Sequence, residues 1–193
     1  MIKLDGSANK EKFGANAILS LSLAFSKLEA DHKKLPYYKL FEKKGNYKMP
    51  VPLMNLLNGG AHSNNGLDIQ EFMIVPKVGD SFFDAVRAGA EIFQNLKKII
   101  SEKSLPTAVG DEGGFAPELN GNMDALDLLM KAIESAWYKP GEEIFLALDV
   151  AATEFYDDEA GVYNFEGQQL KAEGLLEFYQ GLSKKYPIIS IED

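Results

Sequence analysis

Short apolar strands that alternate with an amphipathic helix are the feature that most constrains the fold of this sequence. Residues 144–148 (IFLAL) and 188–191 (IISI) are short segments in which almost every side chain is apolar. Between them, Leu175, Phe178, Tyr179 and Leu182 recur at the spacing of one helix face. This order predicts parallel strands in a sheet that is covered by helices on both faces.

The segment before these strands has a different pattern. Residues 51–57 (VPLMNLL) and 71–75 (EFMIV) predict two strands, and the polar loop between them favours an antiparallel pair. Two helices are expected next, one capped by Ser81 with Asp84 three residues on, and one capped by Asn122. Their predicted apolar faces comprise Phe82, Val86, Ile92, Phe93, Leu96, Ile99 and Ile100, and then Leu126, Leu129, Ile133 and Trp137. Residues 155–165 are expected to form a turn region.

The N-terminal part of the chain is expected to be helical. A helix is predicted from Asn9 to about His32, with Asp5 and Ser7 as capping residues near its start. Its apolar face would comprise Phe13, Ala17, Ile18, Leu21, Ala24, Phe25 and Leu28. Pro36 interrupts the pattern, and a short second helix is expected from Tyr37. Residues 43–46 (KKGN) indicate a linker, which places a domain boundary at about residue 48.

Composition excludes several classes of function. The net charge is −9 and there is no basic stripe, so nucleic acid is not an expected partner. No apolar run approaches the length of a membrane span, and no apolar signal core is present, so we expect a cytoplasmic protein. The absence of cysteine excludes disulfides and thiolate metal sites. An acidic chain that binds an anionic substrate would need metal cations to offset the repulsion.

Acidic residues follow both of the late strands. Asp149 comes directly after residues 144–148, and Glu192 follows residues 188–191. The carboxyl ends of parallel strands form the active face of α/β folds, and Gln70 and Glu71 can reach that face from the start of their antiparallel strand. Carboxylates that converge on one pocket repel each other unless a proton or cation intervenes, and oxygen ligands favour magnesium. The alternative is that Asp149 and Glu192 are helix caps or surface acids.

Two glycine-rich segments supply further candidate residues. Residues 109–117 (VGDEGGFAP) hold the acid pair Asp111 and Glu112 between glycines, which permit sharp turns and close approach to a ligand. His62 lies in the glycine-rich loop of residues 58–66 (NGGAHSNNG). An ordinary acidic surface turn and an ordinary turn histidine are the alternatives for these two segments.

Taken together, these segments resemble the enolase family over the whole length of the chain. The resemblance is carried, in the same order, by residues 4–10 (LDGSANK), 13–18 (FGANAI), 52–60 (PLMNLLNGG), 68–74 (DIQEFMI), 109–117 (VGDEGGFAP), 146–149 (LALD) and 186–193 (YPIISIED). It implies that residues 1–47 are the helical end of a small α+β N-terminal domain. Residues 48–193 would then be the first half of an enolase-type ββαα(βα)6 barrel, an α/β fold that opens with antiparallel strands.

The resemblance also implies an activity. Members of the family are glycolytic lyases that reversibly dehydrate 2-phosphoglycerate to phosphoenolpyruvate and depend on magnesium. It implies that Asp149 and Glu192 are metal ligands and that Glu112 is the acid that helps the hydroxyl group leave. His62 and Glu71 would lie beside Glu112 around the substrate, and Gln70 would join them in binding it. A homo-oligomer, at least a dimer, is expected of the full-length protein.

One departure from the family pattern governs these expectations. The chain ends at Asp193, before the strands that carry the third metal carboxylate, the lysine base and the cationic groups for the phosphate in this family. We therefore expect an internal fragment of an enolase that is inactive by itself. The alternative is a non-catalytic binding piece, since family members also occur at cell surfaces as adhesins.

Overall fold

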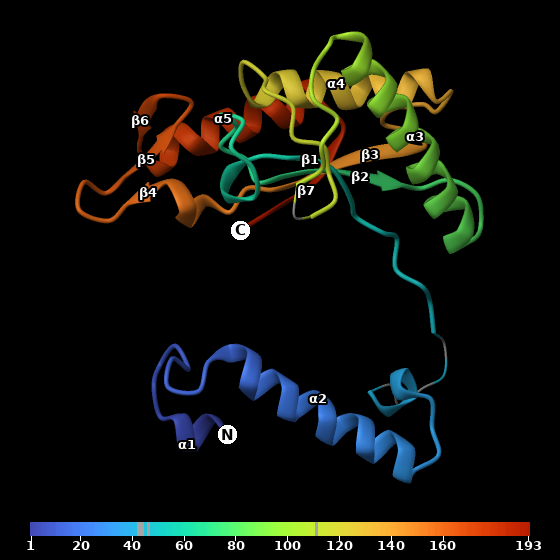
Figure 1. Cartoon of the computed structure of the whole chain (residues 1–193), viewed down its shortest axis with the longest axis vertical. Helices are drawn as coiled ribbons and strands as arrows, with labels where there is room; N and C mark the ends of the chain where they lie inside the picture. Colours follow the sequence, from blue (N-terminus) through green and yellow to red (C-terminus); the bar gives the residue numbers. More distant parts are fainter. Residues whose placement is uncertain (42–44, 46, 111) are drawn as a thin grey trace. The chain divides into compact units, whose positions relative to one another are not determined.

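The computed structural model describes residues 1–41, 45, 47–110 and 112–193. Three residues of the predicted linker (Lys43, Lys44 and Asn46) and Asp111 lie outside the described residues. The chain forms two compact units, Met1–Lys48 and Met49–Asp193. Figure 1 shows both units.

The first unit contains α1 (Ile2–Asp5), α2 (Ala15–His32) and the 3-10 helix η1 (Tyr37–Leu40). The expected helix from Asn9 therefore begins six residues late. Lys10 and Gly14 both have positive φ values, 56° and 77°, which a helix cannot accommodate. The predicted capping role of Asp5 is also wrong, because its Oδ2 accepts from the backbone N–H of Phe13 (2.8 Å) and folds the preceding loop.

Most of the predicted apolar face of α2 remains exposed in this unit. Phe25 and Leu28 are 71% and 65% exposed, and Ala30 is the buried residue of the helix. The hydroxyl groups of Ser26 and Tyr37 lie 2.9 Å apart and join α2 to η1. A unit of this size has too few elements to enclose both sides of a long helix.

The second unit is built on a mixed sheet with the strand order β1-β2-β3-β7. These strands are β1 (Met54–Asn58), β2 (Glu71–Pro76), β3 (Ile144–Asp149) and β7 (Ile188–Glu192). The β1–β2 pair is antiparallel and the β3–β7 pair is parallel, which confirms both sequence expectations. The β2–β3 pair is antiparallel. Strand β1 begins later than expected, at Met54, and Pro52 before it has no N–H to donate to a ladder.

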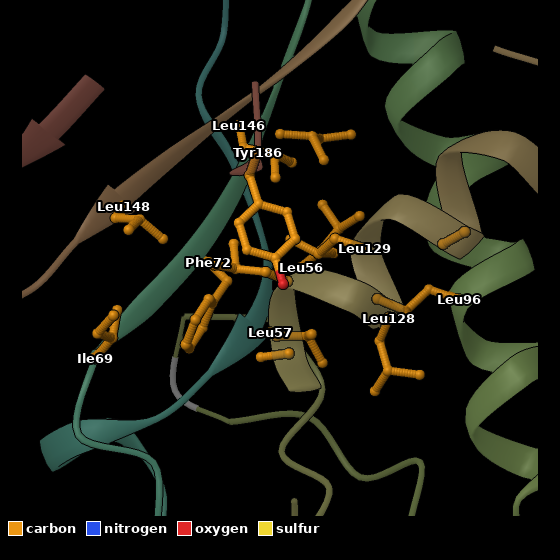
Figure 2. Packing of buried hydrophobic residues seen from close by; sticks show 14 of the residues in the cluster. Leu56, Leu57, Ile69, Phe72, Leu96, Leu128, Leu129, Leu146, Leu148 and Tyr186 are labelled. Carbon is orange, nitrogen blue, oxygen red and sulfur yellow. The ribbon is translucent and has the colours of Figure 1, made fainter. Parts of the chain in front are cut away.

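Helices α3 (Phe82–Glu102), α4 (Asn122–Ser135) and α5 (Ala172–Lys185) pack on one face of this sheet (Figure 1). Alternate strand residues such as Phe72 and Leu148 belong to the same buried cluster as Leu96 of α3 and Leu129 of α4 (Figure 2). The opposite face carries a separate buried group, Met73, Val75 and Ala147. The strand–helix alternation predicted helices on both faces of the sheet. This expectation is wrong for the described residues, where the helices cover one face. A sheet that curves into a barrel keeps its inner face for other strands.

Two further expectations around α4 are wrong. The residue at the N-cap of α4 is Gly121, and Asn122 is the first helical residue, with its side chain bonded elsewhere. Trp137 is 94% exposed and lies beyond the helix end with φ 65°, so it contributes nothing to the apolar face. By contrast, Ser81 caps α3 as predicted, because its Oγ accepts from the N–H of Asp84.

The expected turn region of residues 155–165 is largely a small antiparallel sheet. It consists of β4 (Tyr156–Asp157), β5 (Val162–Phe165) and β6 (Gln168–Leu170). Phe165 is buried against Phe178 of α5, with ring centroids 4.9 Å apart. In the described part of the chain, no helix is both long and apolar enough to cross a membrane.

Candidate active site

One row of polar residues crosses the end of the main sheet. Asn58 pairs with Glu71, Glu71 with Asp149, and Asp149 with Glu192. Residues that are directly opposite on neighbouring strands have side chains on the same face of a sheet. The sheet therefore brings the carboxylates of Glu71, Asp149 and Glu192 to one side, the side away from the helices.

Burial and neighbouring acids disfavour the charged form of one carboxyl group in this row, that of Glu71. Burial raises the pKa of the Glu71 carboxyl group, the nearby charges of Asp149, Glu112 and Glu192 raise it further, and His62 acts in the opposite direction. A raised pKa means that the charged form of Glu71 is disfavoured where it lies. The row is thus a place where a proton or a cation is stabilised.

Asp149 holds one oxygen ready for a further partner. Its Oδ2 accepts from the side-chain amide of Gln70 (3.2 Å). Its Oδ1 is buried and has no hydrogen-bond partner among the described residues. A buried, unpaired carboxylate oxygen carries a large desolvation cost unless something binds it. This oxygen, with the neighbouring Glu192, has the chemistry of a ligand set for a hard cation.

A second cluster lies against Glu71. Ligand atoms of His62, Glu71 and Glu112 all lie within 4.8 Å of one another, which is close enough to hold a metal ion or a small polar ligand. The His62 Nδ1 atom is 4.0 Å from Oε1 of Glu71 and is buried without a hydrogen-bond partner in the described part of the chain. The cluster thus offers an imidazole and two carboxyl groups to one small molecule.

The loop that carries Glu112 is held against strand β1. The N–H of Phe115 donates to the carbonyl of Leu56, and the N–H of Asn58 donates to the carbonyl of Phe115, both at 2.9 Å. A Cβ atom on Gly114 would lie 2.9 Å from backbone atoms of Leu56 and Leu57. Glycine is therefore required for this close approach, and the approach places Glu112 beside the end of the sheet.

The loop that carries His62 is tied to the same place by Asn65. The side-chain amide of Asn65, which is 6% exposed, donates to the carbonyls of Asn58 (2.9 Å) and Pro117 (3.0 Å). One side chain therefore joins strand β1, the His62 loop and the Glu112 loop. Sequence reasoning missed Asn65, because it lies in a polar loop among other asparagines and nothing in its spacing marks it.

Comparison with known proteins identifies the source of this arrangement. Residues 46–193 match the family model described as "Enolase, C-terminal TIM barrel domain", and residues 1–41 match "Enolase, N-terminal domain". The chain belongs to the enolase family. It is 55% identical over 190 residues to the enolase of Bdellovibrio bacteriovorus, a match that covers 98% of this chain and 44% of that protein. The chain thus spans less than half the length of this curated relative.

The enolase match explains the mixed sheet. The described unit Met49–Asp193 corresponds to part of a TIM barrel domain, and it opens with the antiparallel strands that the resemblance implied. The residues that the sequence singled out lie together at one end of the main sheet. Gln70 bonds to Asp149, which lies in register with Glu71 and Glu192, and Glu71 in turn lies beside His62 and Glu112.

Proposed function

We propose that the protein to which this chain corresponds catalyses the reversible dehydration of 2-phosphoglycerate to phosphoenolpyruvate, as a magnesium-dependent lyase of glycolysis. The observation that carries the proposal is the juxtaposition of the carboxylate row Glu71–Asp149–Glu192 with His62 and Glu112. Membership of the enolase family and the 55% identity to a protein named enolase support it.

Asp149 and Glu192 are the proposed magnesium ligands. The buried Oδ1 of Asp149 has no partner among the described residues, and Glu192 lies in register beside it on the parallel strand β7. Both are oxygen ligands, the type that magnesium prefers. Magnesium, when bound, stabilises the negative charge that develops on the substrate carboxylate as the α-proton is removed. Gln70 orients Asp149 through its amide hydrogen bond.

Glu112 is the proposed acid for the departing hydroxyl group. A β-hydroxyl group leaves poorly unless it receives a proton, so a carboxylic acid must lie within reach of it. Glu112 lies within the cluster with His62 and Glu71, and the raised pKa of Glu71 favours a proton in this cluster. We infer that His62 and Glu71 bind and orient the hydroxyl end of the substrate beside Glu112, with Gln70 on the metal side.

A hybrid protein tests the proposal. In this hybrid, residues 1–193 replace the matching segment of the Bdellovibrio bacteriovorus enolase, so that this chain supplies Asp149, Glu192 and Glu112. We expect the hybrid to form phosphoenolpyruvate from 2-phosphoglycerate when magnesium is added, and the isolated chain 1–193 to form none. A hybrid that is folded by circular dichroism and size-exclusion chromatography but has no turnover would contradict the proposal.

Two expectations about the whole protein remain predictions. The homo-oligomer is implied by the family resemblance, and the cytoplasmic location is expected from the sequence, which shows no signal core and no apolar run of membrane-span length. Size-exclusion chromatography of the hybrid with light scattering addresses the first.

A further inference from the structure

The N-terminus of α4 is capped by a residue that lies far along the chain. Gly121 at the N-cap offers no side chain, and no side-chain cap from this position is present. Instead, Oε1 of Glu166, from the turn between β5 and β6, accepts from the backbone N–H of Asn122 (3.0 Å). A carboxylate here satisfies an orphan donor and interacts favourably with the helix dipole.

The same oxygen of Glu166 also orients the side chain of Asn122. It accepts from Nδ2 of Asn122 at 3.0 Å, and Asn122 is fully buried. With its amide nitrogen fixed in this way, Oδ1 of Asn122 is turned toward Ile69 and accepts from the backbone N–H of Ile69 at 3.1 Å. The planar amide thus transmits the position of Glu166 to the backbone that leads into β2.

A second bond joins the two segments directly. The backbone N–H of Glu166 donates to Oδ2 of Asp68 at 2.8 Å. Asp68 and Ile69 immediately precede Gln70, whose side-chain amide donates to Asp149, and Glu71, which lies beside His62. Glu166 therefore holds the side chain of Asp68 directly and the backbone of Ile69 through Asn122, just before the chain enters the candidate active site.

We propose that Glu166 is a positioning residue. Acting through Asn122, it fixes the backbone of Ile69 and so sets where the side chains of Gln70 and Glu71 lie. The inference rests on the proposed function for the roles of Gln70 and Glu71, but the bonds themselves do not depend on it. Because the Ile69 N–H lies just outside the ladder of β2, the oxygen of Asn122 is the partner that keeps it in place.

Hydrogen exchange on the chain 1–193 tests this inference. We expect Glu166→Ala to speed amide exchange at Ile69 by about tenfold, the effect of losing one ordinary hydrogen bond. Exchange at Ile74 of β2 and Leu146 of β3 should change much less. The side-chain amide signals of Gln70 in an NMR spectrum should shift as well. Glu166→Gln should restore both readouts, because its amide oxygen accepts from the same two donors.

A double variant separates positioning from helix capping. In Glu166→Ala/Gly121→Ser, the new serine is a favourable N-cap for α4, but it does not replace the bond from Glu166 to the Asn122 side chain. Glu166→Ala should lower the free energy of unfolding, because α4 loses its cap. In the double variant we expect this stability to recover and the fast exchange at Ile69 to persist. Glu177→Ala, at an exposed glutamate in the middle of α5, serves as the matched control and should change neither readout.

Several outcomes would overturn the inference. These are unchanged exchange at Ile69 in Glu166→Ala, equal acceleration at Ile69, Ile74 and Leu146, or recovery of Ile69 protection in the double variant. Failure of Glu166→Gln to restore the Gln70 signals would also contradict it. All measurements use the chain without substrate, so an inactive hybrid would count against the proposed function and leave this result unaffected.

Discussion

Glu71 and Asp149 lie directly opposite each other on the antiparallel strands β2 and β3, with their carboxyl groups on the same face. Like charges in this position destabilise a sheet. Burial and the neighbouring acids raise the pKa of Glu71, so a proton on Glu71 relieves the repulsion. The sheet is therefore less stable with all of its carboxylates charged than with one of them protonated or bound to a cation.

The first prediction concerns the pH dependence of stability. Because the pKa of Glu71 is raised by folding, the folded state binds its proton more tightly than the unfolded state does. This contribution is fully present below the ordinary pKa of a glutamate and is lost as the pH rises through the raised value. Glu71→Gln removes the carboxylate, so it avoids this loss. The free energy of unfolding of the variant, relative to that of the native chain, should therefore increase from pH 4 to pH 7.

Urea unfolding of the chain 1–193 at both pH values measures this difference. Glu177→Gln, at an exposed position of α5, is the matched control and should show a constant difference from the native chain. A stability difference for Glu71→Gln that stays flat across the range would show that folding does not raise the pKa of Glu71.

The second prediction concerns magnesium. In the hybrid protein, Asp149→Asn or Glu192→Gln should weaken magnesium binding by at least about tenfold, since even the partners that only orient metal ligands have effects of this size. Isothermal titration calorimetry measures the affinity. Asp158→Asn, at an exposed site beside β4, is the control and should bind as the unmodified hybrid does. Unchanged magnesium affinity in both Asp149→Asn and Glu192→Gln would contradict the assignment of these residues as magnesium ligands.

The third prediction concerns the close approach of the Glu112 loop to β1. Gly114→Ala places a Cβ atom 2.9 Å from the backbone of Leu56 and Leu57, so the loop must shift. We expect a loss of about 1–3 kcal/mol in the free energy of unfolding. Gly181→Ala in α5 meets no atom within 4 Å and should instead stabilise the chain by up to about 1 kcal/mol. Urea unfolding that shows equal effects for both variants would contradict the packing described.

The fourth prediction concerns Trp137. This residue is 94% exposed and has a φ of 65° just past the end of α4, a position where glycine is usual. Trp137→Gly should stabilise the chain by about 1 kcal/mol, because glycine adopts this conformation without a steric penalty. Trp137→Ala retains the Cβ atom and should give little gain. Thermal unfolding followed by far-UV circular dichroism distinguishes the variants. A destabilised Trp137→Gly would contradict the prediction, because it would show that the indole ring stabilises the folded chain.

The sequence predicted the elements of the main sheet well because their signals are local. Each of β2, β3 and β7 is a short apolar run that can be recognised from its own residues. The acids Glu71, Asp149 and Glu192 lie at the ends of these runs, so their positions at the ends of the strands were predicted as well. Trp137 shows where such reasoning fails. It falls at helical spacing after Ile133, but α4 ends at Ser135 and the left-handed conformation turns the indole into solvent.

The structure brings together the candidate residues that motifs and the family resemblance had singled out, but the residues that hold them in place were not predicted. The candidates are His62, Gln70, Glu71, Glu112, Asp149 and Glu192. Asn65 and Glu166 were not predicted, because each acts on residues distant in the chain: Asn65 on Pro117, and Glu166 on Asn122 and Asp68. Asn122 itself was expected to cap α4, since asparagine favours that position, and tertiary hydrogen bonds override the preference.

Glu112 is the proposed acid in a site built on the Glu71–Asp149–Glu192 row. In the hybrid protein, Glu112→Gln keeps the shape of the side chain but removes its proton. The decisive measurement compares two rates in this variant: formation of phosphoenolpyruvate, and exchange of the C2 proton of 2-phosphoglycerate with deuterated solvent. We predict that dehydration slows by about 10²-fold or more while exchange continues at close to its original rate. A parallel loss of both rates, or unchanged dehydration, would contradict the role of Glu112.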